Sequence, residues 1–297
     1  MERSMPHRLM LAACAALFAL PAAADPFPDA TRLVSIGGSL TEIVYALGEG
    51  ERLVGRDSTA IYPPEALALP DLGYMRALSP EGVLSAGPTA LLVLEGSGPP
   101  EALDVLEAAG VPYRVVPEDH SHEGILAKIA AVGDSLGVPD RAAALSAEID
   151  DALDRAEALT RDVAEKRRVL FVLSVDGGKI QASGTGTAAD AIIALAGGVN
   201  AVTEYEGYKA LSEEAIIAAR PDVILMMDRG GDHAATDADL LASPAIGLTP
   251  AGRDATIIRL DGAYLLGFGP RTADAVTDLA RALYGAALAR EGQGDGR

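Results

Sequence analysis

The sequence predicts an α/β protein of two lobes, each built on a parallel sheet, joined by one long helix. Three observations predict this fold class. Short apolar strands alternate with helices in both halves of the chain, one pattern of residues occurs in each half, and a long segment free of glycine and proline lies between them. Strands that alternate with helices are typical of βα units, in which successive strands lie parallel.

The first 24 residues have the pattern of an export signal. A basic start precedes an apolar run at residues 9–20, and three alanines at 22–24 offer a cleavage site. The apolar run is shorter than the ~20 residues that a membrane-spanning helix needs. Residues 11–14 also fit the cleavage box of a bacterial lipoprotein, but that cut would leave much of the apolar run in the mature chain. We expect a signal peptide at residues 1–24 and a periplasmic protein, with lipoprotein anchoring at Cys14 as the alternative.

The composition argues against several classes of function. The formal net charge of −19 and the pI of about 4.5 argue against nucleic acid as a partner, because phosphate binding needs clustered Lys and Arg. Cys14 is the single cysteine, so a chain cut after residue 24 has neither a disulfide nor a catalytic thiol. The enzyme alternative, a periplasmic hydrolase, would need a Gly-x-Ser-x-Gly elbow or a carboxylate pair with a base. The sequence has no such elbow, and we expect no enzymatic activity.

Residues 25–139 form the predicted N-terminal lobe. Its first strand, 32–36, ends at two glycines, and Ser39 then caps a helix in which Glu42 completes a capping box. Further strands are expected at 52–55, 91–94 and 111–116, with a helix at 100–109. His120 and His122 could bind zinc, but a zinc site needs four ligands in tetrahedral geometry, so we interpret their segment as a solvated loop.

Residues 140–166 contain no glycine or proline and carry leucine at helical spacing. They predict one interlobe helix, ~40 Å long at 1.5 Å per residue. Residues 167–290 form the predicted C-terminal lobe, and residues 291–297 a flexible polar tail. The C-terminal lobe is expected to contain strands at 168–173, 223–227 and 256–260 and helices at 187–196 and 272–289.

One pattern occurs at residues 73–94 and again at 207–227. From Ala77 and Ala210 onward the two copies align without a gap over 18 residues, and seven of the aligned pairs are identical. A repeat that is not tandem predicts two related lobes whose equivalent loops face one another across a ligand cleft. Each copy opens with a tyrosine and a basic residue, so we expect each lobe to contribute one tyrosine and one basic residue to the lining of the cleft.

Five motifs together resemble one family. They read RLVSIGGSLTE at 32–42, GYMRALS at 73–79, GTGTAAD at 184–190, EGYKALS at 206–212 and LLGFGPR at 265–271. Over essentially the whole mature chain, the sequence resembles the periplasmic substrate-binding proteins of bacterial haem ABC importers, within the group that binds vitamin B12 and ferric siderophores. The resemblance implies two α/β lobes bridged by a long helix, and a monomer that delivers haem to an inner-membrane ABC permease with its ATPase. The alternative is a vitamin B12 or ferric-siderophore carrier of the same fold, which the absence of tryptophan disfavours.

The resemblance also implies roles for particular residues. A first-lobe tyrosine binds the haem iron in that family, and Tyr74 matches its position. Ferric iron prefers an anionic oxygen, and a guanidinium from Arg76 or Arg229 would favour the phenolate. Candidate partners for the haem propionates are Arg76, Lys209 and Arg271. Tyr208 is a candidate for lining the cleft, with simple packing as the alternative. No histidine occurs at 174–178, where a second iron ligand would be sought, so five-coordinate iron is expected.

Glu81 and Glu214 are an identical pair of the repeat. Each lies in the first turn of a predicted helix, where the helix dipole alone favours a carboxylate. The related transporters dock one glutamate from each lobe onto arginines of the permease, and the resemblance implies this role for both residues.

Overall fold

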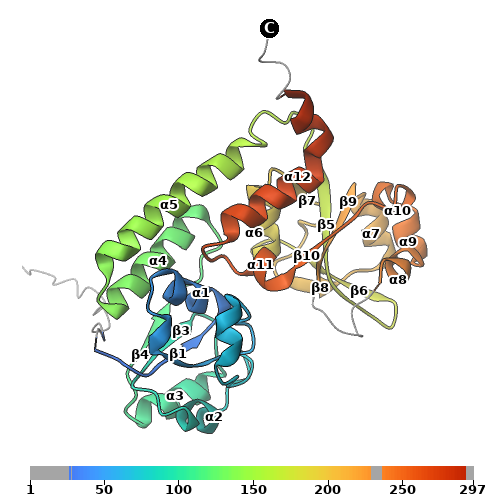
Figure 1. Cartoon of the computed structure of the whole chain (residues 1–297). Helices are drawn as coiled ribbons and strands as arrows, with labels where there is room; N and C mark the ends of the chain where they lie inside the picture. Colours follow the sequence, from blue (N-terminus) through green and yellow to red (C-terminus); the bar gives the residue numbers. More distant parts are fainter. Residues whose placement is uncertain (1–26, 28, 229–235, 292–297) are drawn as a thin grey trace, which may run out of the picture.

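The computed structural model describes residues 27, 29–228 and 236–291. The predicted export signal with Cys14, Arg229 and tail residues 292–297 lie outside the described residues. Two lobes lie side by side in Figure 1, the N-terminal one in blue and green and the C-terminal one in yellow to red. Each lobe carries a sheet with helices around it, which confirms the predicted α/β fold class. Within the described ranges, no helix is long and apolar enough to cross a membrane.

The N-terminal sheet has four parallel strands in the order β2-β1-β3-β4. The strands are β2 (Leu53–Arg56), β1 (Leu33–Ile36), β3 (Ala90–Leu94) and β4 (Tyr113–Val116). Both central strands are fully buried, as expected of a parallel sheet covered on both faces. The carboxyl ends of parallel strands share one edge, so the loops that follow these strands meet there. The helices of this lobe are α1 (Gly38–Ala46), α2 (Pro80–Ser85), α3 (Pro100–Ala108) and α4 (His122–Leu136), with 3-10 turns η1 (Gly50–Arg52) and η2 (Pro64–Ala68).

The sequence interpretation missed helix α4. The segment expected to be a solvated loop ends where α4 begins, with Ser121 as its cap. His122 then lies between Asp150 (2.8 Å) and Glu157 (3.2 Å) of the next helix. Gly133 allows that helix to approach, because a Cβ atom at this position would collide with the side chain of Ala142.

The interlobe helix is shorter than predicted. Helix α5 spans Pro139–Ala158, so the prediction of a helix through residue 166 is wrong in its last part. Beyond the helix, Thr160 is buried against Gly197 of the C-terminal lobe. This tertiary contact turns the chain although the sequence contains no helix breaker. Helix α5 packs on α4 and on α12 (Thr272–Glu291), which runs beside it in Figure 1.

The C-terminal sheet is mixed. Its order is β10-β9-β5-β6-β8, with β7 beside β5. The strands are β5 (Arg168–Asp176), β6 (Lys179–Ser183), β7 (Val199–Asn200), β8 (Tyr208–Ala210), β9 (Val223–Asp228) and β10 (Ile257–Asp261). Strands β6 and β8 are antiparallel, whereas the sequence predicted a parallel sheet. The β5–β6 hairpin turns at Gly177 and Gly178, which both have positive φ (54° and 80°), as tight hairpins require.

Six further helices surround this sheet. They are α6 (Ala188–Leu195), α7 (Glu213–Ala219), α8 (Asp237–Leu241), α9 (Pro244–Gly247), α10 (Pro250–Arg253) and α11 (Gly262–Leu266). The repeat is visible in three dimensions, since Ser79 caps α2 before β3 and Ser212 caps α7 before β9. The loops ahead of these helices differ, because Tyr74 lies in irregular structure and Tyr208 begins strand β8.

Candidate functional site

Tyr74 lies on an exposed loop between the N-terminal sheet and α2. Its side chain is 44% exposed, and its phenol oxygen accepts a hydrogen bond from Nη1 of Arg76 at 2.8 Å. A guanidinium held against a phenol oxygen stabilises negative charge on that oxygen. The loop therefore presents an accessible oxygen that is already paired with a permanent cation.

Hydrogen bonds hold both ends of this loop. Asp71 accepts from the hydroxyl of Ser58 (2.8 Å) and from the amide of Gly73 (2.9 Å). Burial tends to raise the pKa of Asp71, but these two donors together with the guanidinium of Arg56 outweigh it, and the pKa lies below its ordinary value. Gly73 has a φ of 101°, which favours glycine. At the other end, the amide of Gly98 donates to the carbonyl of Met75 (2.9 Å).

Tyr208 is exposed to a similar extent as Tyr74, 38% against 44%, but its hydroxyl has different neighbours. Its ring meets Phe171 edge-on, with centroids 6.4 Å apart. Burial raises the pKa of Tyr208, although the hydroxyl of Thr187 and the amide of Ala189 partly oppose this. The phenol therefore stays protonated at neutral pH, with its hydroxyl turned toward the start of α6. The start of α6 thus engages a tyrosine of its own lobe.

A charged residue of the N-terminal lobe acts electrostatically on Tyr208 of the C-terminal lobe. The cation of Arg76 acts on the pKa of Tyr208 and also on that of His120. Burial, partly opposed by Glu118, lowers the pKa of His120, whose ring meets Phe268 of the C-terminal lobe at 4.9 Å. The structure thus brings Tyr74, Arg76 and Tyr208 to the same junction between the lobes.

The candidate bases of the C-terminal lobe have different surroundings. Lys209 follows Tyr208 in strand β8, and successive strand residues point to opposite faces of a sheet. Its Nζ lies 5.0 Å from the ring centre of Tyr205. Arg229 lies outside the described residues.

Arg271 already has a carboxylate partner. Its guanidinium donates to both oxygens of Glu42, at 2.9 and 2.6 Å, and lies 3.8 Å from the ring centre of Tyr62. The predicted capping box is therefore wrong. Gly37, rather than Ser39, occupies the cap position of α1, and the side chain of Glu42 crosses to the other lobe.

Glu81 and Glu214 are matched in geometry. Each is fully exposed, and its own backbone amide, followed by the cap hydroxyl of Ser79 or Ser212, holds its pKa below the ordinary range. Both carboxylates therefore stay charged at neutral pH and lose their charge only at a lower pH than an ordinary glutamate does. Each lobe presents one such charge at the start of a short helix.

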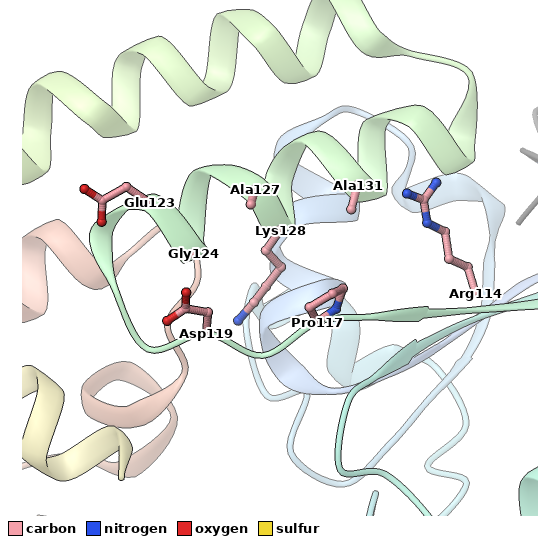
Figure 2. A pocket seen from close by; sticks show the side chains of 8 residues that line it. All are labelled: Arg114, Pro117, Asp119, Glu123, Gly124, Ala127, Lys128 and Ala131. Carbon is pink, nitrogen blue, oxygen red and sulfur yellow. The ribbon is translucent and has the colours of Figure 1, made fainter. Parts of the chain in front are cut away.

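A cavity of about 400 Å³ lies elsewhere in the N-terminal lobe, between α4 and the segment after β4 (Figure 2). Lys128 points from α4 toward the loop that carries Asp119. The cavity is lined by Arg114, Pro117, Asp119, Glu123, Gly124, Ala127, Lys128 and Ala131, so neither candidate tyrosine contributes to it. Over the part of the chain that the structure describes, no group of three or more His, Cys, Asp or Glu residues could hold a metal ion.

Comparisons with known proteins agree with this architecture. The periplasmic heme-binding protein BhuT in complex with two hemes is 44% identical, with a TM-score of 0.82 over 86% of this chain and 98% of that one. The periplasmic heme-binding protein RhuT from Roseiflexus sp. RS-1 gives the same identity, TM-score and coverage. A vitamin B12-binding protein of Vibrio cholerae is 26% identical over 270 residues, covering 90% of this chain and 94% of the relative.

The model of the periplasmic binding protein family matches residues 33–264. That span includes both sheets and the helices that join them. The chain belongs to the periplasmic binding protein family, as a non-enzymatic substrate-binding component of an ABC transporter of the type that carries haem, vitamin B12 or siderophores.

Proposed function

We propose that this protein captures ferric haem between its lobes and delivers it to an inner-membrane ABC permease. The observation that carries the proposal is the 2.8 Å hydrogen bond from Arg76 to the exposed phenol oxygen of Tyr74. Ferric iron is a hard Lewis acid that binds anionic oxygen, and the guanidinium of Arg76 places a positive charge beside the phenol oxygen of Tyr74. The heme-binding proteins that are 44% identical over most of the chain support the same ligand.

The two tyrosines have separate roles in this proposal. Tyr74 is the iron ligand, because its oxygen is accessible and paired with a cation. Tyr208 forms part of the opposite wall, because its hydroxyl is engaged by Thr187 and Ala189 at the start of α6. Its ring offers an apolar surface to the porphyrin. The iron is then five-coordinate with respect to the protein.

The haem propionates would accept hydrogen bonds from the remaining N–H groups of Arg76. A guanidinium has five N–H groups, and the bond to Tyr74 uses one of them. Arg229 is a further proposed partner from the second lobe, whereas we leave Lys209 out of the ligand set, because it lies on the face of β8 opposite to Tyr208. We leave Arg271 out of the ligand set, because its bidentate pairing with Glu42 already occupies its fork of donors.

Vitamin B12 is the second candidate ligand. The relative from Vibrio cholerae that binds it matches 90% of this chain. The ligand-binding features of the site favour haem over it, because a tyrosine paired with an arginine suits ferric iron. The test is to titrate the purified protein with ferric haem and, separately, with cyanocobalamin. We expect saturable binding of haem and none of cyanocobalamin at the same concentrations. The reverse result would assign the protein to the corrinoid carriers.

Glu81 and Glu214 are the proposed contacts with the permease. They are exposed, equivalent in the repeat and charged at neutral pH. Charges at the edge of an interface mainly set its register and association rate. One glutamate on each lobe would therefore orient the cleft over the permease.

A further inference from the structure

One short segment of the C-terminal lobe makes a cluster of contacts with the N-terminal lobe. Residues 267–271, here called the interlobe segment, lie between α11 and α12. In Figure 1 the chain between these helices reaches toward α1 and α4 of the other lobe. Its contacts are with α1, with α4 and with the loops beside them, and they include two buried ionic groups.

The first contact is between Arg271 and Glu42. Both guanidinium-to-carboxylate bonds are short (2.9 and 2.6 Å), and the carboxylate is nearly buried at 8% exposure. Tyr62 of the N-terminal lobe stacks on the guanidinium at 3.8 Å, and Tyr264 lies 5.3 Å from it. Burial raises the pKa of Glu42 and Arg271 opposes this, so separation of the lobes would remove the cation that stabilises the carboxylate.

The second contact is between Lys128 and Phe268. Nζ of Lys128 donates to the carbonyl oxygen of Phe268 at 3.0 Å and to Glu118 at 2.8 Å. The side chain of Lys128 is completely buried, so the carbonyl supplies a bond that water cannot replace while the lobes are together.

The backbone at Phe268 is shaped for this contact. Its φ of 46° lies in the left-handed region, which costs energy for a residue with a side chain. The conformation is held by the bond from Lys128, by the packing of the ring against His120, and by the buried position of the side chain. The next residue, Gly269, approaches Ser39 so closely that a Cβ atom would lie 3.3 Å from the serine Cβ.

We propose that the interlobe segment is a lock that sets the width of the cleft and holds the Tyr74 loop opposite Tyr208. Glu42, Lys128 and Arg271 are thus positioning residues for ligand binding. Opening the cleft would break two links between the lobes, one made by Glu42 and one by Lys128, both of which are buried charges. Without these links the lobes would be connected through helix α5. The consequence for ligand release rests on the proposed function, while the restraint on lobe motion does not.

The test measures the distance between the lobes in the ligand-free protein. Spin labels are placed at Ser85 and Ala218, which are exposed and equivalent in the repeat, in a chain whose Cys14 is replaced by alanine. Double electron–electron resonance then compares this chain with Glu42→Gln, Arg271→Gln and the double variant. Asp237→Asn, which weakens one ion pair of Arg259 within one lobe, is the matched control.

The expected result is a narrow distance distribution in the parent and in the control, and a distinctly broader one in all three lock variants. The double variant should be no broader than the worse single variant, because the two residues act through one link. Arg271→Lys, which keeps a cation near Glu42, should recover part of the narrow distribution. Unchanged distributions in all lock variants would overturn the proposal.

Ligand release provides an independent measurement. The dissociation rate of ferric haem should rise several-fold in Glu42→Gln and Arg271→Gln and stay unchanged in Asp237→Asn. If haem does not bind to any of the chains, the proposed function fails, and the spin-label distances alone decide the lock. Lys128→Met, which removes the second link, should also broaden the distance distribution; if that variant does not fold, the Glu42 and Arg271 variants still decide the lock, since Arg271 is partly exposed and its substitution leaves the buried Lys128 in place.

Discussion

Nη1 of Arg76 lies 2.8 Å from the phenol oxygen of Tyr74, whereas the hydroxyl of the equivalent tyrosine of the other lobe, Tyr208, is engaged by Thr187 and Ala189 at the start of α6. The two lobes thus use the same repeated tyrosine in different electrostatic settings. One phenol oxygen is paired with a guanidinium, and the other is held by a hydroxyl and an amide at the start of a helix. Sequence symmetry alone does not assign these roles, and the predictions below depend on the difference.

Arg76→Gln should weaken the affinity for ferric haem while leaving the fold intact. The substitution removes a charged donor from the phenol oxygen, and a hydrogen bond to a charged group contributes about 1.5–3 kcal/mol when shielded from water. Because Arg76 is exposed, we expect the lower end, roughly a tenfold loss of affinity. An absorption titration measures it. Arg114→Gln, which alters the separate cavity, should bind haem like the parent. Equal affinity in Arg76→Gln and the parent would show that Arg76 does not assist the ligand.

Asp71→Asn should loosen the Tyr74 loop at neutral pH. In the folded chain the pKa of Asp71 is below its ordinary value of 3.8. A carboxylate with a lowered pKa stabilises the fold above the ordinary value, and this stabilisation is lost as the pH falls below it. The protection factor of the Gly73 amide in the ligand-free protein, the ratio of its intrinsic to its observed exchange rate at each pH, should therefore be high at neutral pH and fall below about pH 3.8. In Asp71→Asn the amide should be less protected throughout, and equal protection at neutral pH would contradict the role given to Asp71.

Gly73→Ala should destabilise the protein although there is room for the methyl group. No atom lies within 4 Å of the Cβ position, so the cost comes from the φ of 101° alone. That strain amounts to about 1–2 kcal/mol. Urea unfolding measures it. Gly247→Ala is the control, because its Cβ position is equally open and its backbone is helical without a positive φ, so stability should be unchanged or slightly higher.

Glu81→Gln and Glu214→Gln should impair transport without affecting ligand binding. Both carboxylates are fully exposed and lie on different lobes, so neither contributes to the cleft or to the core. Haem uptake into vesicles that contain the permease should fall in each variant and fall further in the double variant. Glu213→Gln, an exposed neighbour in the same helical turn as Glu214, is the control. Normal uptake by the double variant would remove these residues from the interface.

Much of the fold could be predicted because it depends on local patterns. The strands at 32–36, 91–94 and 168–173 are apolar runs that end at turn residues or helix starts, and Ser79 and Ser212 cap their helices as serines in such positions do. The pairing of Tyr74 with Arg76 is local as well, since the two residues are neighbours in one loop.

The missed features depend on contacts between distant residues. Helix α4 contains Gly133, an unfavourable helix residue that the close approach of Ala142 makes necessary. The end of α5 is decided by the docking of Thr160 on the other lobe. The bond between Glu42 and Arg271 joins residues 229 positions apart, and nothing in the local sequence distinguishes Glu42 from an ordinary helix-start carboxylate.

The most direct test of the central claim is the absorption and electron paramagnetic resonance spectrum of the ferric haem complex, in the parent, Tyr74→Phe and Tyr208→Phe. We expect a high-spin tyrosinate spectrum in the parent and in Tyr208→Phe. Tyr74→Phe should lose that spectrum and most of its affinity. A tyrosinate spectrum that persists in Tyr74→Phe and disappears in Tyr208→Phe would contradict the assignment of the iron ligand.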